Sequence, residues 1–322
     1  MVEKSGKNSH GKAQSAHRFA PPGDTVLAHR WIGKSEDGNT ITLRKLKTEM
    51  FKIPAYYNEA WATGNTDLIR NGAVIDVETT GLDQREDKVI EIGLRLFQFN
   101  RSTGEVLHYG ESYSAFQDPG FPLSPEIIAL TGITDEVLKD QKIDWDHVNQ
   151  LLKKCQIVIA HNASFDRPFI DALASESPSK IWGCSFKQVG WHDHGFSSQK
   201  LDVLSIYHGF FTDAHRALND SDALLYLLSH SSEKSPTPYL FELLNNARKP
   251  TVFVSALYSP FETKDLLKAR QYRWEPNLKS WVKEVFTEQK ESEIQWLEEV
   301  IYQGKFKGKT QEIQPVDHFK LN

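Results

Sequence analysis

The sequence of 322 residues has little cysteine, with only Cys155 and Cys184. Two cysteines in apolar surroundings do not make the disulfide framework of a small secreted protein, and their spacing matches no zinc site. We therefore expect both to be small core residues of a cytoplasmic protein. The sequence also lacks any apolar run near the ~18–20 residues of a membrane helix, so no membrane partner is expected. Its first residues contain no apolar segment, which argues against a secretory signal.

The net charge of -5 is unevenly distributed along the chain. Residues 1–72 carry 11 basic and 7 acidic side chains, residues 73–231 carry 13 and 23, and residues 232–322 carry 14 and 13. The acidic excess therefore lies in the middle segment. Such a segment does not favour simple electrostatic binding of a polyanion, unless metal ions reverse the local field.

Changes in composition and pattern divide the chain into five predicted segments. The segments are a disordered tail at 1–25, an N-terminal leader at 26–72 with a hairpin and a short helix, an α/β domain at 73–231, a linker at 232–250 and a small C-terminal α+β domain at 251–322 whose last residues form a loose tail.

The segment 73–231 begins with strands and continues with a strand and helices in alternation. Strands are expected at 72–79, 87–99, 104–116 and 156–162, and helices at 124–132, 144–155, 163–175, 198–211 and 215–231. This order predicts an α/β fold with a mixed sheet flanked by helices.

The stretch AVIDVETTGLD places two carboxylates, Asp76 and Glu78, two positions apart in an apolar strand. Residues i and i+2 of a strand point to the same face. Two like charges held close in a partly dry site raise each other's pKa and cost stability. A hard cation such as Mg²⁺ or Mn²⁺ removes that cost. Taken alone, the pair fits a metal site and a solvated strand end equally well.

Two later stretches supply further acids beside apolar segments. Asp166 follows the strand in IAHNASFD and falls in the first turn of a helix, and DAHRALND carries His215 and Asp220. Carboxylates that converge from separate elements can bind two metal ions ~4 Å apart for phosphoryl hydrolysis. Histidine is the side chain suited to take a proton near neutral pH, so His215 is the candidate general base.

These three motifs together resemble the DEDD superfamily of 3'-5' exonucleases, in the histidine subgroup typified by the proofreading (epsilon) subunit of bacterial DNA polymerase III. The matching stretches are IDVETTGLD, HNASFD and HRALND, and the resemblance covers roughly residues 72–231. It implies a ribonuclease-H-like fold. It also implies stepwise hydrolysis of phosphodiester bonds from the 3' end of single-stranded or frayed DNA, with release of nucleoside 5'-monophosphates.

The resemblance also implies roles for individual residues. The expected ligands of two divalent ions, Mg²⁺ or Mn²⁺, are Asp76, Glu78, Asp166 and Asp220, and the expected general base is His215. The terminal nucleotide is expected against Thr79, Thr80, Gly81 and Leu82. Further substrate contacts are expected from His161, Asn162 and Phe165, for which helix capping and core packing are the alternatives.

The sequence leaves several alternatives open. An exoribonuclease is the rival within the same class, and a non-catalytic nucleic-acid-binding module is the rival outside it. The resemblance allows a proofreading or repair role, with a DNA polymerase subunit as partner, but no motif shows one. Nucleic acid is the expected substrate, with DNA favoured over RNA.

Three other features have competing interpretations. The C-terminal stretch ARQYRWEPNLKSWVKEV mixes cations and aromatics, which suits single-stranded nucleic acid. The near-neutral charge of residues 232–322 as a whole favours a core role instead. The run 191–194, Trp-His-Asp-His, is interpreted as a solvated loop rather than a metal site. Arg216, beside the candidate base, fits either a phosphate contact or an exposed surface position.

Overall fold

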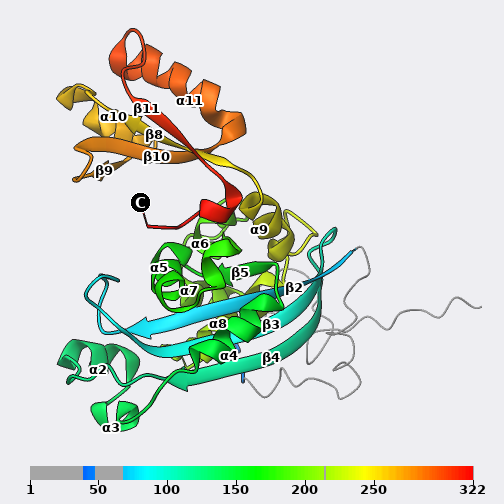
Figure 1. Cartoon of the computed structure of the whole chain (residues 1–322). Coiled ribbons are helices and arrows are strands. Elements are labelled where there is room, and N and C mark those ends of the chain that lie inside the picture. The colour runs from blue at the N-terminus through cyan, green and yellow to red at the C-terminus, as the bar shows by residue number, and fades with distance from the viewer. Residues whose placement is uncertain (1–38, 48–67, 214, 322) are drawn as a thin grey trace, which may run out of the picture.

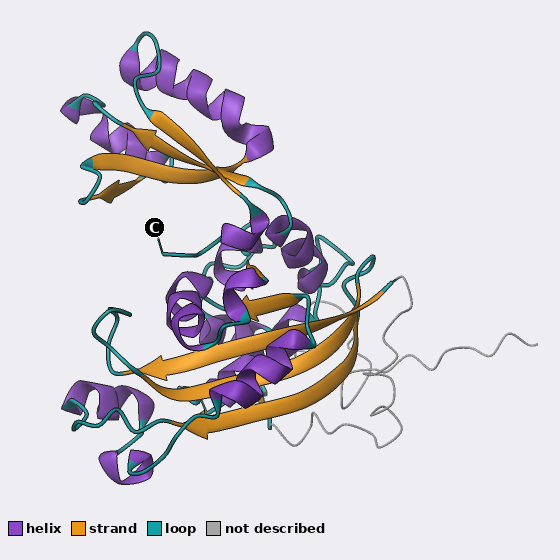
Figure 2. Cartoon of the chain, viewed as in Figure 1, coloured by secondary structure: helices purple, strands orange, loops and turns teal. Residues whose placement is uncertain are grey.

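A five-stranded mixed sheet is the centre of the α/β domain in this computed structural model, which describes residues 39–47, 68–213 and 215–321 (Figures 1 and 2). The strand order is β4-β3-β2-β5-β6. The strands are β2 (Ile69–Thr79), β3 (Val89–Asn100), β4 (Val106–Phe116), β5 (Ile157–Ala160) and β6 (Ile181–Cys184). The first three pair antiparallel, and β5 and β6 run parallel to β2. The predicted mixed sheet of a ribonuclease-H-like fold is confirmed.

Helices cover both faces of this sheet, and the alternation along β2 decides which residues meet which helices. Val74 packs with side chains of α7 (Leu201–Tyr207), α8 (Ala217–Leu228) and α9 (Tyr239–Ala247). Its neighbours Ala73 and Ile75 pack on the opposite face, with α4 (Trp145–Lys153) and α5 (Ala163–Leu173). Because side chains two positions apart share a face, Asp76 and Glu78 continue the Val74 side, toward α8.

Shorter elements connect the strands and helices. They are α2 (Pro125–Thr131), α3 (Asp135–Leu138), η3 (Ser177–Ser179) and α6 (Ser185–Gln188). The predicted start of α2 is confirmed, since the Ser124 hydroxyl accepts the Ile127 N–H and proline follows at the first helical position. No helix within the described ranges is long and apolar enough to cross a membrane. Cys155 and Cys184 are both buried, unpaired core residues, as predicted.

Two strands of this domain depart from the predictions. The strand β6, with sequence IWGC, was not anticipated, because four residues that include a glycine show no alternating pattern. The expected helix at 198–211 stops at Tyr207, and β7 (Phe210–Phe211) follows it. This short strand pairs in parallel with β1 (Arg44–Lys45). The expected tail at 1–25 and most of the leader at 26–72 lie outside the described residues.

The second unit is a four-stranded antiparallel sheet with the strand order β11-β8-β10-β9. Its strands are β8 (Thr251–Ala256), β9 (Arg273–Glu275), β10 (Ser280–Phe286) and β11 (Lys309–Ile313). Its helical elements are η4 (Phe261–Thr263), α10 (Lys264–Ala269), η5 (Thr287–Gln289), α11 (Lys290–Trp296) and the π-helical η6 (Leu297–Tyr302). Val252, Val254, Leu267 and Leu297 form its core.

The prediction of a loose tail after residue 302 was wrong. Lys309–Ile313 form the edge strand β11, and η7 (Pro315–Asp317) then returns to the α/β domain. Arg167 of α5 is fully buried there and donates hydrogen bonds to the carbonyl oxygens of Val316 and His318, at 2.8 and 2.6 Å. The lysines and glycines at 303–309 are typical of a loose segment, which led to the wrong prediction. The segment is held through its backbone carbonyl oxygens, and no side-chain pattern indicates such contacts.

Candidate active site

Three of the predicted acids lie together where β2 ends beside α8. One carboxylate oxygen from each of Asp76, Glu78 and Asp220 lies within 4.8 Å of the other two. Asp76 and Glu78 come from the β2 face that packs on α8, and Asp220 stands in the first turn of that helix. The predicted convergence of the strand pair with the third motif is therefore present in the structure.

The helix α8 approaches the sheet closely because β3 offers it no side chain at Gly93. A Cβ added there would lie 2.1 Å from the backbone carbon of Ala217. Ser221 donates a hydrogen bond to the Gly93 carbonyl oxygen at 3.0 Å. At the next residue of the helix, Asp222 pairs with the buried Arg95 through two hydrogen bonds of 2.7 and 3.0 Å. These contacts fix the start of the helix, and therefore Asp220, against the strands.

Asp166 reaches the same region from the other side of β2. The pairing of β2 with β5 extends only to Val74 and Ile159, so further along the strand Val77 needs another acceptor for its N–H. The buried Asp166 side chain supplies it, at 3.2 Å from the nitrogen. Asp166 stands outside the 4.8 Å group, but its charge acts on Asp76. All four predicted metal ligands thus lie around the end of β2.

The carboxylates perturb one another strongly. Burial, followed by the charges of Asp166, Asp220, Glu78 and Glu91, raises the pKa of Asp76 well above its ordinary value. Burial and the neighbouring charges raise the pKa of Glu78 to about 8. Burial also raises the pKa of Asp166 and of Asp220. A cluster of oxygen donors that resists ionisation by itself fits a hard divalent cation, whose charge would offset the repulsion.

Glu91 is a fifth carboxylate at this site, and sequence reasoning missed it. It lies opposite Glu78 in the antiparallel register of β2 and β3, and only 1% of it is exposed. Arg216 donates to both of its oxygens from Nε, at 3.2 and 3.3 Å, and the Ala217 N–H donates at 3.4 Å. The available signal was a single acid within the apolar run VIEIGL. Arg216 is also exposed, which fits the surface alternative, and its guanidinium meets Glu91.

His215 lies two residues before the first residue of α8, Ala217, and is exposed. Its backbone φ of 61° is in the left-handed region, which non-glycine residues adopt rarely. The His215 N–H donates to Asp220 Oδ2 at 2.9 Å, which holds the strained backbone in place. The same carboxylate group thus belongs to the acidic cluster and fixes the histidine's main chain.

The loop after β2 holds its own threonine hydroxyls. Thr79 donates to the Gly81 carbonyl at 2.6 Å, and Thr80 donates to Asp87 Oδ1 at 2.9 Å. The second Asp87 oxygen accepts the Asp83 N–H, and a Cβ on Gly81 would meet this carboxylate at 2.4 Å. Asp87 therefore shapes the loop, a role that no sequence signal indicated. Leu82 projects outward, with 83% of it exposed.

The three weaker substrate candidates differ in their surroundings. His161 Nδ1 lies 2.7 Å from Ser185 Oγ, and burial lowers the pKa of this imidazole to about 4. Asn162 is exposed at the start of α5, and its side chain makes no capping hydrogen bond. Phe165 is partly buried and packs 5.3 Å from Phe169, between ring centroids. Phe165 therefore packs against the core, whereas the Asn162 side chain does not cap the helix.

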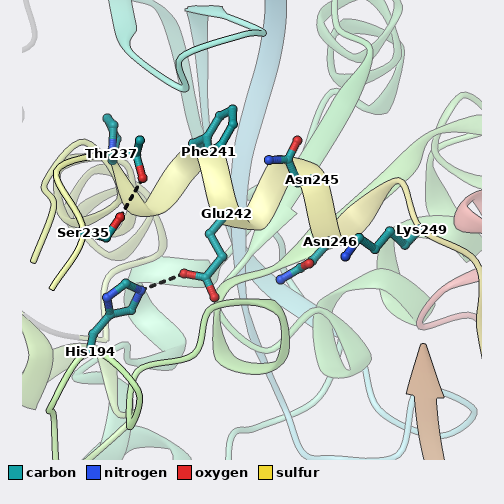
Figure 3. Close-up of a pocket in the computed structure, with 9 residues that line it drawn as sticks. His194, Ser235, Thr237, Phe241, Glu242, Asn245, Asn246 and Lys249 are labelled. Carbon is teal, nitrogen blue, oxygen red and sulfur yellow. Dashed lines mark hydrogen bonds and ion pairs between the residues drawn. The ribbon is translucent and has the colours of Figure 1, made fainter. Parts of the chain in front are cut away.

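The run 191–194 is a turn, as the sequence suggested, with His192 and Asp193 exposed, but its first residue is not solvated. Trp191 is fully buried in the core. His194 Nδ1 lies 2.7 Å from Ser232 Oγ, and His194 Nε2 lies 2.7 Å from Glu242 Oε2. Figure 3 shows Glu242 of α9 pointing at His194, on the wall of a cavity of about 340 Å³. This cavity shares no lining residue with the acidic cluster. The large apolar side chain of Trp191 packs in the core, which brings the start of this turn into the interior.

Comparisons with known proteins agree with this geometry. Residues 73–228 match the family described as Exonuclease. This part of the chain belongs to that family. Within it, the chain is similar to "DNA polymerase III PolC-type" of Listeria welshimeri serovar 6b, with 32% identity over 166 residues. It is also similar to the protein of that name from Bacillus subtilis (strain 168), with 33% identity over 184 residues. The resemblance to DEDD exonucleases is therefore confirmed.

These relatives are much longer than the chain. The match to the Listeria protein covers 48% of this chain and 11% of the relative, and the match to the Bacillus protein covers 55% and 12%. Among solved structures, "The zinc ion bound form of crystal structure of E.coli ExoI-ssDNA complex" has a TM-score of 0.45 at 16% identity. That match covers 67% of this chain and 63% of the other. It is too distant to inform function.

Proposed function

We propose that the chain is a metal-dependent 3'-5' exonuclease that hydrolyses DNA and releases nucleoside 5'-monophosphates. The observation that carries the proposal is the group of carboxylate oxygens from Asp76, Glu78 and Asp220 within 4.8 Å of one another. Membership of residues 73–228 in the exonuclease family supports it. Asp166 and His215 complete the proposed catalytic set. Asp166 accepts the N–H of Val77, the residue between Asp76 and Glu78, and the His215 N–H donates to Asp220.

The donor set suits divalent cations. Asp76, Glu78, Asp166 and Asp220 would hold two ions, Mg²⁺ or Mn²⁺, since carboxylate oxygens are the ligands these metals prefer. When bound, such ions acidify water and stabilise the charge of the leaving oxygen. The raised pKa values of the acids indicate that the protein has placed more negative charge here than it can stabilise alone.

His215 is proposed to take the proton from the attacking water. Its exposed side chain, its main chain bonded to Asp220 and its position two residues before the helix that carries Asp220 support this role. The loop Thr79–Leu82 is proposed to seat the 3' nucleotide. Leu82 supports that role, because an apolar side chain exposed to solvent can lie against a base. The hydrogen bond from the Thr80 hydroxyl to Asp87 holds the shape of the loop.

DNA is the proposed substrate because relatives matched over residues of this domain are named DNA polymerase III PolC-type. The same chemistry would act on RNA, and the discrimination depends on contacts near the 2' position. A proofreading or repair role beside a DNA polymerase subunit is proposed on the same ground. Co-purification of a polymerase subunit with the tagged full chain would support that partner, and its absence would favour independent action.

The test is a digestion panel with the full chain. End-labelled single- and double-stranded DNA and RNA, with free and blocked 3' ends, are incubated with Mg²⁺, Mn²⁺ or EDTA. We expect stepwise shortening of free 3' ends of DNA with either metal and none with EDTA. Asp220→Asn should abolish it, whereas Asp146→Asn, an exposed acid in the first turn of α4, should not. Intact DNA and RNA under all metal conditions would refute the proposal, and faster loss of RNA would reassign the substrate.

A further inference from the structure

A row of aromatic and lysine side chains lies along one edge of the second unit. The residues of this row are Phe261, Lys264, Lys268, Trp281 and Trp274. Lys264 Nζ lies 4.3 Å from the centroid of the Phe261 ring, and Lys268 Nζ lies 5.9 Å from that of Trp281. The rings of Trp281 and Trp274 are 5.8 Å apart between centroids. The two lysines are four positions apart on α10, so they share one side of that helix.

The outer aromatics of this row are not part of the core. Phe261 is 75% exposed and Trp274 is 49% exposed. The core of the unit is made instead by residues such as Leu267 and Tyr272, and Trp281 only borders it. The expectation of a core role therefore fits Tyr272 and fails for Trp274. An exposed tryptophan on an edge strand leaves one ring face available for a partner.

The lysines of the row differ from two nearby cations, Arg270 and Lys283, which are ion-paired. Arg270 Nε and Lys283 Nζ each donate to a carboxylate oxygen of the buried Glu293 at 3.2 Å, so both cations are ion-paired. Lys268 has only a 3.9 Å contact with Asp265, and both side chains are largely exposed. An exposed pair of that length is worth little in water. The positive charge of the row therefore remains available to an anion.

The geometry points to single-stranded nucleic acid as the occupant of this row, an inference that extends the proposed exonuclease function. Bases of a single strand expose faces that stack on aromatic rings, and its phosphates are anions that pair with lysines. The row offers both, with rings at its two ends and the two lysines between them. A duplex hides those faces. In Figure 1 the α10–β9 edge and the end of β2 lie on the same side of the molecule. The row would therefore hold the strand behind its 3' end.

Binding is measured on the full chain carrying Asp220→Asn, in EDTA, by fluorescence anisotropy with a single-stranded thymidine oligomer of about 30 nucleotides and a matched RNA. The pair Phe261→Ala and Trp274→Ala should weaken binding about thirtyfold or more, since stacking contributes ~1–3 kcal/mol per base and two rings are removed. The pair Lys264→Ala and Lys268→Ala should also lower the slope of log affinity against log salt by about 1.4. The control pair is Lys307→Ala and Lys309→Ala, which removes the same amount of charge at the opposite edge of the sheet. Lys309 begins the edge strand β11, and Lys307 lies two residues before it.

A second measurement uses the catalytically intact chain. The row variants should keep the wild-type kcat and KM on an oligomer of about 4 nucleotides, and should raise KM about tenfold on the longer one. Unchanged affinity for the longer DNA and RNA, or an equal loss in the control pair, would overturn the inference. If the chain binds through the row but digests nothing, the proposed enzymatic function is refuted and the inferred binding role of the row is supported. If it digests both lengths and the row variants match wild type, only the row fails.

Discussion

Glu91 shows how one side chain can belong to the site without being among the expected ligands. Its carboxylate is buried opposite Glu78, raises the pKa of Glu78 and Asp76, and receives the Arg216 guanidinium. It therefore adds negative potential to the place where cations would bind, and it ties the residue next to His215 to β3. Both effects act through neighbours, which makes Glu91 a positioning residue rather than a ligand.

The substitution Glu91→Gln should keep the fold and weaken the response to metal. Loss of the charge lowers the attraction for cations, so the Mg²⁺ concentration for half-maximal hydrolysis should rise about tenfold, equivalent to ~1.4 kcal/mol. A Mg²⁺ titration of hydrolysis measures this, with the exposed acid substitution Glu105→Gln as control. An unchanged half-saturation would mean that Glu91 acts only in packing.

The raised pKa values also predict how stability depends on pH. Burial and like charges raise the pKa of Glu78 from 4.5 to about 8. Between these two pH values the folded chain therefore binds more protons than the unfolded chain. Without metal, the free energy of unfolding should therefore fall as pH rises through this window. Cations that bind only the folded state reverse the loss, and they should do so more strongly at high pH.

Thermal unfolding in EDTA and in Mg²⁺, at about pH 5 and about pH 8, tests this linkage. The increase in Tm on adding Mg²⁺ should be larger at the higher pH, and Glu78→Gln should reduce that difference. Equal increases at both pH values would show that the cluster does not titrate in this window.

At the scale of elements, the pairing of α8 with β3 decides where Asp220 lies. Gly93 admits the helix, and the buried Arg95–Asp222 pair fixes it one turn beyond. Asp222→Ala removes the carboxylate from a buried guanidinium, which should lower the free energy of unfolding by ~3–5 kcal/mol. Replacing both partners, Arg95→Met with Asp222→Leu, should recover much of that loss. Denaturant unfolding measures both, and a double variant as unstable as the single one would contradict this account.

Some of these elements were predictable and others were not, for identifiable reasons. The shared face of Asp76 and Glu78 follows from strand alternation, and the position of Asp166 follows from the start of a helix after a buried strand. The role of Glu91 depends on the register of β2 with β3, which periodicity does not supply. The order β4-β3-β2-β5-β6 likewise requires non-local pairing, and β6 was too short to show a pattern.

At the scale of the molecule, Arg167 joins two units and stands next to a proposed metal ligand. Its guanidinium bonds the carbonyls of Val316 and His318, while the neighbouring Asp166 accepts the Val77 N–H. His318 is buried, with its ring nitrogens 3.4 Å from Gln188 Nε2 and from Thr251 Oγ1. The segment after β11 therefore contacts the α/β domain and the second unit at once.

The substitution Arg167→Met should detach this segment. The expected result is faster hydrogen exchange of the backbone amides at 314–321 and a loss of ~2–4 kcal/mol in the free energy of unfolding, because buried charged hydrogen bonds are removed. Lys187→Met, which removes an exposed cation 5.3 Å from the centroid of Phe319, should cost less than ~1 kcal/mol. Wild-type exchange at 314–321 in the Arg167 variant would contradict the assignment.

The attachment by Arg167 has a consequence for how this protein can vary. Its hydrogen bonds reach main-chain oxygens, which every amino acid carries. The residues at positions 316 and 318 are therefore free, as far as these two bonds are concerned, to be exchanged over evolutionary time without release of the segment. A survey of related chains that looks for invariant side chains at 314–321 would overlook the attachment. Arg167, directly after Asp166, is the better marker of a chain that shares this architecture.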